Sequence, residues 1–383
     1  MNATILYIDQ SNYYGGGQKI AFSVLKYFKK NGWNIIVMFP DGGNLKDIVF
    51  NEKFKYIPLP DLNIENGKKK IKDYYLYIKN ENKSISIISE TIKHYDCDII
   101  YTLSPRLLRI IYKSSKAKCT PIVFHFEMLY NNMIWEKYFK YYFKKSNIKR
   151  IIALSDFCYK WLVDKVIKSD KVVTINNWVV ESDANADNSK EFSLPSTIAK
   201  SFKYAVIGRI LTIKGQKTFI EAALHQCEIE KQTEYYVIGD TTFGNERYKK
   251  DLHELVKKSK FSSRIHFVDF LKEIACIYRS VDCVVVPSIW NEPFGLVAIE
   301  AMYYETPVIV SNRGELPNIV GNGQFGVIFR AGDHEDLLRK MIEIKEDQST
   351  MHTMIKSAKE NVNIKFNEAT QTINIYEQIK NVL

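Results

Sequence analysis

The sequence predicts two consecutive α/β domains, each built on a doubly wound parallel sheet. Short apolar runs alternate with helix-like segments throughout the 383 residues, which is typical of β-α-β units. The alternation stops at a polar stretch, Glu181–Lys190, and then starts again. The length also fits two domains better than one.

In the first half, apolar runs predict five strands with helical patterns between them. The strands are expected at Thr4–Ile8, Asn34–Phe39, Asp98–Leu103, Pro121–His125 and Arg150–Leu154. Helical periodicity is found at Gln18–Lys30 and Leu107–Ser114. Ligands of open parallel sheets bind beyond the carboxyl ends of the strands, so polar residues at those ends are the first candidates for a site.

The second half repeats the pattern. Its strands are expected at Tyr204–Ile207, Tyr235–Ile238, Ile265–Phe267, Cys283–Val286 and Pro307–Val310. We therefore expect one domain at residues 1–178, a linker at 179–195, a second domain at 196–362, and a C-terminal helix at 363–383 that could pack back on the first domain. Two such domains are expected to face each other across a cleft.

Composition narrows the functional class. No run of eighteen or more apolar residues occurs, which argues against a membrane-spanning helix. The segment Met1–Gln10 reads as a strand rather than a secretory signal, so we expect a cytoplasmic protein. The six cysteines are scattered without a C-x-x-C pair, which supports neither a metal site nor a disulfide framework.

The net charge of +10 is unevenly spread. Between Asp61 and Arg150 there are 18 Lys and Arg against 9 Asp and Glu, an excess that suggests an anionic partner. Within this stretch, Met128–Ser146 mixes aromatic residues with lysines. Such a helix suits an anionic bilayer interface, although aromatics packed on the domain beneath solvated lysines would give the same pattern. We expect peripheral membrane contact; nucleic acid is less expected, since no nucleic-acid-binding motif occurs.

A glycine turn, Tyr14–Gln18, lies between the first strand and the first helix. Gly16 and Gly17 would let backbone N–H groups approach an anion, and the helix start would add partial positive charge. A plain flexible turn accounts for the same residues, because the dinucleotide pattern G-x-G-x-x-G is not completed.

A basic loop, Gly208–Gly215, follows the expected strand Tyr204–Ile207. It carries Arg209 and Lys214, two cations at the carboxyl end of a strand. This pair suits a diphosphate, because arginine can bind two oxygens at once and lysine adds a compact charge. The alternative is a solvated basic loop.

An acidic segment, Pro287–Glu300, combines two carboxylates with a helix start. Glu292 lies on the expected loop, and Glu300 follows about two helical turns into a helix beginning near Phe294. Apolar neighbours indicate that this helix is buried, and a buried carboxylate needs a partner. Free amides at the helix start would point at a ligand: those of Phe294, Gly295 and Leu296.

His125 ends the apolar run that begins at Ile122. At a strand end it would face the expected cleft. An imidazole in such a place is more often structural than catalytic, so His125 alone indicates little.

In their order along the chain, these motifs resemble those of glycosyltransferase family four, whose members are retaining enzymes with the GT-B fold of two Rossmann-like domains. The resemblance rests on Gly208-Arg209 with Lys214-Gly215, and on Glu292 and Glu300 in an E-x7-E arrangement. It extends over nearly the whole chain through weaker likenesses at Gly15–Gly17, Ser155–Phe157, Asn176-Asn177 and Gly239-Asp240.

The resemblance implies a role for each matching residue. Arg209 and Lys214 would bind the donor diphosphate, Glu292 the transferred sugar, and Glu300 the ribose hydroxyls. Backbone groups of the strand ending at Val268 would meet the base, near the turn at Gly239. Gly16 and Gly17 would approach the phosphates or the acceptor, and His125 would contact the sugar. The family often has glycine where Asp269 and Glu315 stand, which leaves base preference and sugar contacts open.

The expected activity is retaining, metal-independent transfer from a nucleotide-diphosphate sugar to a glycan acceptor, without a cofactor. A lipid-linked acceptor at the inner face of the cytoplasmic membrane is expected, as in bacterial synthesis of O-antigen, capsule or lipopolysaccharide. The alternative is a synthase or phosphorylase of the same fold that acts on a soluble sugar or sugar phosphate.

Overall fold

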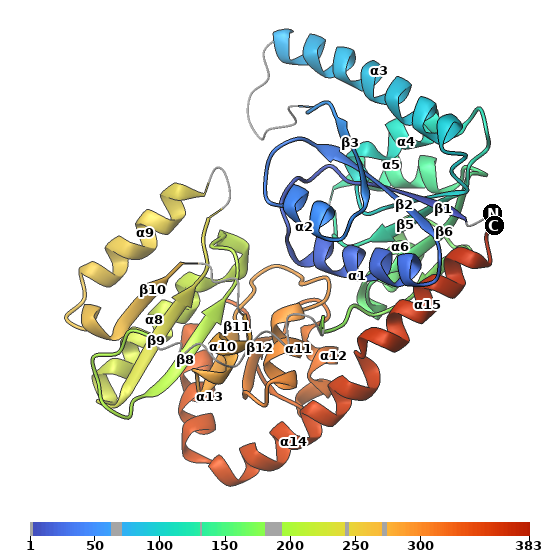
Figure 1. Ribbon diagram of the computed structural model, residues 1–383. Helices are drawn as coiled ribbons and strands as arrows, with labels where there is room; N and C mark the ends of the chain where they lie inside the picture. The colour runs from blue at the N-terminus through green and yellow to red at the C-terminus, as the bar shows by residue number, and fades with distance from the viewer. Residues whose placement is uncertain (1–2, 63–70, 131, 181–193, 242–244, 270–273) are drawn as a thin grey trace. The chain divides into compact units, whose positions relative to one another are not determined.

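The computed structural model describes residues 3–62, 71–130, 132–180, 194–241, 245–269 and 274–383. These form two units, one made of Met1–Asn177 with Ala369–Leu383 and the other of Trp178–Glu368 (Figure 1). Most of the linker expected at 179–195 lies outside the described residues. Each unit has its own parallel sheet.

The first unit contains a seven-stranded sheet in the order β3-β2-β1-β4-β5-β6-β7, with every pair parallel. The order reverses between β1 and β4, so the segments after these two strands diverge at the carboxyl edge. The strands are β1 Thr4–Ile8, β2 Asn34–Pro40, β3 Lys55–Leu59, β4 Ile99–Thr102, β5 Ile122–Phe126, β6 Ile148–Ala153 and β7 Val172–Thr174.

Helices cover both faces of this sheet. On one face, Phe22 of α1 packs edge-on against Tyr7 of β1. On the other, Phe143 of α5 packs against Phe124 of β5. The helices of this unit are α1 Gly16–Lys30, α2 Leu45–Asn51, α3 Ile71–His94, α4 Leu108–Ser115, α5 Met133–Phe143, α6 Asp156–Lys165 and α15 Glu368–Lys380.

The C-terminal helix α15 belongs to the first unit although it follows the second in sequence. Its Tyr376 ring contacts the rings of Tyr27, Phe28 and Trp33 at centroid distances of 5.5, 5.0 and 6.1 Å. The segment expected as one helix from residue 363 is divided, because α14 ends at Lys365 and α15 begins at Glu368.

The second unit contains a six-stranded parallel sheet in the order β10-β9-β8-β11-β12-β13. Its order reverses between β8 and β11. The strands are β8 Phe202–Ile207, β9 Thr233–Ile238, β10 Ile265–Val268, β11 Cys283–Val286, β12 Val308–Ser311 and β13 Val327–Phe329. The helices are α8 Gln216–Ile229, α9 Glu246–Lys257, α10 Ile274–Arg279, α11 Leu296–Tyr303, α12 Leu316–Ile319, α13 His334–Glu346 and α14 Gln348–Lys365.

Both units therefore confirm the predicted doubly wound α/β class. The expected strands form, and sequence reasoning missed β3, β7 and β13, which have weak apolar patterns. β3 carries an exposed lysine and Pro58, and both features are tolerated at the sheet edge where this strand lies. β7 and β13 are three residues long and end their sheets.

Candidate active site

The switch point of the second unit brings two predicted motifs together. The loop after β8 carries Arg209 and ends in a short 3-10 turn, Thr212–Lys214, while the loop after β11 carries Glu292. Gly215 joins them closely: its φ is +75°, and a Cβ there would lie 1.9 Å from the carbonyl oxygen of Pro287. Only glycine fits this approach, which therefore fixes one loop against the other.

Lys214 and Glu292 form a direct ion pair across these loops. The ammonium Nζ of Lys214 lies 2.8 Å from Oε1 and 2.9 Å from Oε2 of Glu292. The Ser288 hydroxyl donates to Oε2 at 2.7 Å. Gly314 supports the backbone, since a Cβ at its φ of +62° would lie 2.1 Å from the Glu292 carbonyl oxygen. The carboxylate is thus held in one place.

Burial would by itself raise the pKa of Glu292, but the neighbouring cations reverse the shift. The charge and hydrogen bonds of Lys214, the hydroxyl of Ser288 and the charge of Arg209 together lower the pKa below its ordinary value. Arg209 is exposed beside this pair. The structure therefore brings Arg209, Lys214 and Glu292 together at one strand edge, with the carboxylate ionised at neutral pH.

The helix after Glu292 begins later than the sequence suggested. α11 starts at Leu296 with Gly295 before it at φ +122°, whereas a start near Phe294 was expected. Phe294 is buried and packs edge-on against the ring of Phe366, so it anchors the loop. The partial positive charge of the helix start belongs to the residues after Gly295.

Glu300 lies on the second turn of α11 and is half-buried. The hydroxyl of Tyr278, from α10, donates to Glu300 Oε2 at 2.6 Å. Tyr278 is fully buried, so it provides the partner that a carboxylate on a largely apolar helix requires.

Gly239 and Val268 shape the far side of this sheet edge. Gly239 has φ +139°, and a Cβ there would lie 2.1 Å from the carbonyl oxygen of Gly208. The amide of Gly239 donates to the carbonyl of Val268 at 2.9 Å. Just beyond, the Lys249 ammonium lies 2.9 Å from Asp240 and 3.5 Å from Asp269. Asp269, at a position where the family often has glycine, is thus an exposed carboxylate with the cationic Lys249 as a neighbour.

In the first unit, His125 is buried at the end of β5. Its Nδ1 lies 2.8 Å from the hydroxyl of Tyr101, and its Nε2 has no hydrogen-bond partner among the residues the structure describes. Burial lowers the pKa of His125 to about 3, so the ring is neutral at physiological pH. A neutral imidazole can bind a hydroxyl group but offers no cation.

Sequence reasoning missed two acidic residues beside the glycine turn. Asp9 follows β1 and is buried, and Glu127 follows β5 two residues after His125. A Cβ on Gly17 would lie 1.9 Å from Oε2 of Glu127, so this glycine makes room for that carboxyl group. The available signal was the position of both acids directly after strands near the switch point: Asp9 follows β1, which flanks it, and Glu127 follows β5, one strand beyond β4.

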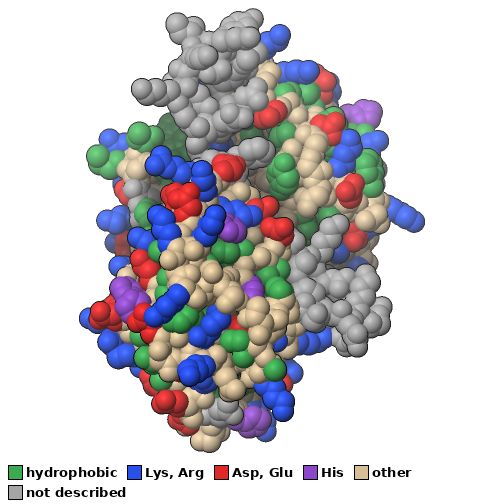
Figure 2. Space-filling view, turned by 90° about the vertical axis from the view of Figure 1, so that its left-hand side faces the viewer, with side chains coloured by type: hydrophobic (Ala, Val, Ile, Leu, Met, Phe, Trp, Pro, Cys, Tyr) green, Lys and Arg blue, Asp and Glu red, His purple; other side chains and the backbone are tan. Residues whose placement is uncertain are grey.

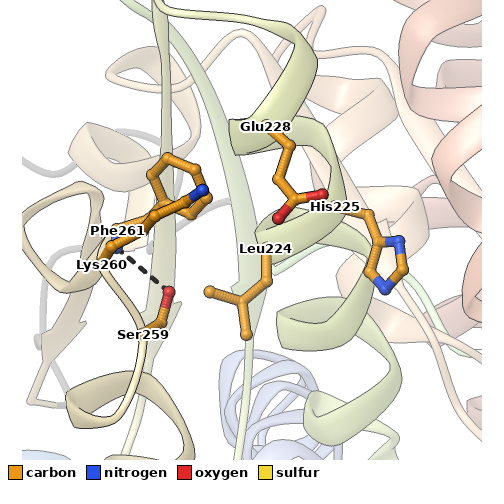
Figure 3. Close-up of a pocket in the computed structure, with 6 residues that line it drawn as sticks. All are labelled: Leu224, His225, Glu228, Ser259, Lys260 and Phe261. Carbon is orange, nitrogen blue, oxygen red and sulfur yellow. Dashed lines mark hydrogen bonds between the residues drawn. The ribbon is translucent and has the colours of Figure 1, made fainter.

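A shallow depression elsewhere in the second unit contains none of these residues. It has a volume of about 360 Å³ and lies between α8 and the segment after α9. Figure 3 shows the lining side chains, with the Phe261 amide donating to the Ser259 hydroxyl at 3.1 Å. The lining residues are Leu224, His225, Glu228, Ser259, Lys260 and Phe261.

Within the described ranges, no three His, Cys, Asp or Glu side chains gather as a metal-binding group. The sequence Asp96–Asp98 has Asp-x-Asp spacing, but it precedes β4 and its Asp98 accepts the Thr4 amide at 2.7 Å, at the amino end of the sheet. Of the helices described, none is long and apolar enough to cross a membrane. On the face shown in Figure 2, basic and acidic side chains are intermixed.

Two doubly wound units in one chain, with candidate groups at both switch points, define the architecture of the GT-B glycosyltransferases. Family models match both halves: Glycosyltransferase Family 4 over residues 14–182 and Glycosyl transferases group 1 over residues 189–361. The chain belongs to the family-four glycosyltransferases.

Solved structures share the fold. A glycosyltransferase from Rickettsia africae superposes with a TM-score of 0.83 at 22% identity, covering 100% of this chain and 98% of that one. An Anabaena HepE structure in complex with UDP and glucose gives a TM-score of 0.80 at 19% identity, covering 98% and 99%.

Relatives in sequence overlap with a smaller share of the chain. An uncharacterized 41.2 kDa protein of the cps region of Klebsiella pneumoniae is 26% identical, with 70% of this chain and 73% of that protein covered. A D-inositol 3-phosphate glycosyltransferase of Corynebacterium efficiens is 30% identical over 41% of this chain, and the match spans 37% of that protein's length.

Proposed function

We propose that this protein is a retaining glycosyltransferase that moves a sugar from a nucleotide-diphosphate donor to a glycan acceptor. The observation that carries the proposal is the cluster of Arg209, Lys214 and Glu292 at the switch point of the second unit. Two cations suit a diphosphate, and a fixed carboxylate suits sugar hydroxyls. The Anabaena protein of the same fold was solved with UDP and with UDP-glucose, which supports the donor class.

The chemistry follows from these charges. Breaking the bond between the anomeric carbon and the diphosphate oxygen leaves negative charge on the diphosphate and positive character on the sugar. Lys214 and Arg209 stabilise the first, and the α11 start adds a favourable dipole. Glu292 accepts hydrogen bonds from sugar hydroxyls, and Glu300 from the ribose. The acceptor hydroxyl attacks the same face, and the departing phosphate takes its proton.

The two cations make a divalent metal unnecessary in this mechanism, because they supply the charge that neutralises the leaving group. The Lys214–Glu292 pair adds a requirement: a bound diphosphate competes with Glu292 for the ammonium group. Lys214 has three donor positions, so one can turn to the phosphate while another stays on the carboxylate.

We also propose that the acceptor is lipid-linked and that α5 meets an anionic membrane surface. Phe139 and Phe143 are buried, so these aromatics pack on the domain. The rest of the helix exposes apolar and basic side chains together, as an interfacial helix does. The exposed residues are Met133 at 70%, Ile134 at 79% and Tyr141 at 58%, with Lys137, Lys140 and Lys144.

The biological setting we propose is bacterial surface-polysaccharide synthesis. Its support is the relative from the cps region of Klebsiella pneumoniae, which matches over most of both chains. A lipid-linked glycan would bring the acceptor to the cytoplasmic face of the membrane, where a basic, apolar helix could hold the enzyme.

The donor is tested by thermal shift of the full-length protein against UDP-, GDP-, ADP- and CDP-sugars, followed by measurement of nucleoside diphosphate release. One nucleotide sugar should raise the melting temperature and be cleaved. Proton NMR of the product should show the donor's anomeric configuration, and EDTA should leave the rate unchanged. Sugar release that depends on inorganic phosphate would instead establish a phosphorylase.

The membrane contact is tested by flotation with vesicles of phosphatidylglycerol and phosphatidylcholine. Wild type should float with anionic vesicles, and a Lys137→Glu, Lys140→Glu double variant should not. Lys250→Glu on α9, at another exposed lysine that lies in the second unit, is the control. Absence of wild-type flotation at low salt would reject the contact.

A further inference from the structure

One oxygen of the Glu127 carboxyl group is unusual because no described residue forms a hydrogen bond with it. Its Oε1 is buried and has no hydrogen-bond partner in the described part of the chain. No step of the proposed sugar transfer involves Glu127. A buried polar atom without a partner costs free energy, so such an atom at a strand end indicates a ligand-binding position.

The position of Glu127 also changes what the glycine turn can bind. Its Oε2 lies against Gly17, in the first turn of α1, where a Cβ would come within 1.9 Å. An anion attracted to the start of α1 would meet this carboxyl group. The site that the glycine turn suggested for a phosphate is therefore occupied by the protein's own acid.

Asp9 gives this edge of the sheet a second acid. Its carboxylate accepts hydrogen bonds from neutral groups: the Tyr7 hydroxyl at 2.5 Å, the Ser11 amide at 3.0 Å, the Ser104 hydroxyl at 3.0 Å and the Gln18 side-chain amide at 3.1 Å. Burial and, secondarily, the charge of Asp9 raise the pKa of Glu127 to about 8. Glu127 thus keeps its proton near neutral pH.

We propose that Glu127 determines acceptor specificity: its carboxyl group binds a hydroxyl group of an uncharged sugar and disfavours an acceptor with phosphate or carboxylate beside that hydroxyl. This inference rests on the proposed function. A protonated carboxyl group both donates and accepts a hydrogen bond, which matches a hydroxyl group. His125 Nε2, also without a described partner, lies two residues earlier, near the end of β5, and offers a second neutral contact.

A phosphate would find two unfavourable acids at this edge. The carboxyl oxygens of Asp9 already accept hydrogen bonds from four neutral donors, and none of these donors is a cation that could compensate a phosphate. Near neutral pH Glu127 is uncharged, but above its pKa of about 8 it ionises, and a phosphate beside it then meets a like charge in a partly buried site, where screening by water is weak. The selectivity therefore comes from repulsion as much as from attraction.

The test uses the full-length protein and the nucleotide sugar that it cleaves. Nucleoside diphosphate release is measured with paired soluble acceptors: glucose and glucose 6-phosphate, and myo-inositol and D-inositol 3-phosphate. At about pH 9, where Glu127 is ionised, wild type should favour the neutral member by roughly tenfold in kcat/KM. Glu127→Gln, which removes the charge but keeps the shape, should narrow this preference to near unity, a change of about 1.4 kcal/mol.

Glu127→Ala should raise KM for the neutral acceptor without changing the thermal shift produced by the donor, because the donor residues lie in the second unit. Glu52→Gln is the matched control, since Glu52 is another half-buried acid of the first unit and pairs with Lys26.

Three results would overturn the inference: a wild-type preference for the phosphorylated members, an unchanged preference in Glu127→Gln, or no acceleration by any neutral sugar of a donor that the protein cleaves. Failure to bind or cleave any nucleotide sugar would instead refute the proposed function, so the two failures are distinct.

Discussion

The ammonium group of Lys214 lies 2.8 Å and 2.9 Å from the two carboxylate oxygens of Glu292, at the junction of the loops that follow β8 and β11. In this arrangement the acid positions the cation as well as neutralising it. The pair is mostly shielded, with side-chain exposures of 30% and 15%. A partly buried pair loses more when one partner is removed than an exposed pair does.

Lys214→Ala should therefore impair donor binding and turnover together. We expect a fall in kcat/KM of about 10²–10³, the cost of removing one group that stabilises developing charge. The measurement is nucleoside diphosphate release, with circular dichroism to establish folding. Lys217→Ala is the control, because Lys217 is 63% exposed and its ammonium group lies 3.5 Å from Glu221, one turn along α8. Equal effects of the two substitutions would contradict the assigned role.

Glu292→Gln should reveal the pair through the pH dependence of stability. The pKa of Glu292 is lowered in the folded protein. Ionised Glu292 therefore stabilises the fold at any pH above about 4.5, the pKa of a glutamate in the unfolded chain. That contribution disappears as pH falls through the lower folded pKa. Urea unfolding should show the variant less stable than wild type at pH 7, with the difference shrinking towards pH 3. A constant difference would disagree with this account.

Tyr278→Phe tests how Glu300 is held. The substitution removes one hydroxyl that donates to Glu300 Oε2 at 2.6 Å and leaves the ring, which stacks on Tyr304 at 5.4 Å. We expect the Kd for the donor to rise by roughly tenfold, since one hydrogen bond to a charged group contributes about 1.5 kcal/mol. Isothermal titration with the donor measures it. A loss of kcat with unchanged donor affinity would show that Glu300 acts elsewhere.

Much of the fold and of the donor side could be predicted because the signals are local. A strand, a loop with Arg209 and Lys214, and a loop with Glu292 follow one another in sequence, and parallel sheets place such loops at one edge. The direct pairing of Lys214 with Glu292 could not be predicted, since 78 residues separate them. It depends on Gly215 and Gly314, which let the backbones approach.

The role proposed for Glu127 could not be predicted from the sequence, for a different physical reason. Its significance comes from what surrounds it in space: Gly17 from another element, Asp9 from another strand, and the lack of a described partner for Oε1. In sequence it is one acid after one strand. Similarly, the sequence predicts the start of α11 near Phe294, whereas the helix begins at Leu296. The sequence does not show that Phe294 packs on Phe366 before the helix begins.

Glu127→Gln should stabilise the protein at neutral and alkaline pH. The pKa of Glu127 is raised to about 8 in the folded protein, whereas in the unfolded chain it is about 4.5. The contribution of protonated Glu127 to the free energy of unfolding is therefore fully present below pH 4.5 and is lost as pH rises through 8. The variant does not suffer this loss. After allowance for partial exposure, we expect a gain of the order of 1–2 kcal/mol at pH 8 and almost none at pH 4.5, measured by urea unfolding. A variant less stable than wild type at pH 8 would contradict the burial of this acid.

Gly17→Ala tests whether the glycine turn serves Glu127. The new methyl group would lie 1.9 Å from Glu127 Oε2, so the carboxyl group must move. We expect acceptor KM to rise by tenfold or more, while helix propensity by itself favours alanine over glycine within α1. Donor affinity, measured by thermal shift, should not follow this change.

The double variant Gly17→Ala, Glu127→Ala separates the two explanations for that glycine. If Gly17 only makes room for the carboxyl group, the second substitution relieves the clash, and the double variant should match Glu127→Ala alone in acceptor KM and in stability. The two effects would then be strongly non-additive, as expected for residues in contact. Additive losses would mean that Gly17 approaches the substrate itself, as the resemblance to the family implied, and that its closeness to Glu127 is incidental.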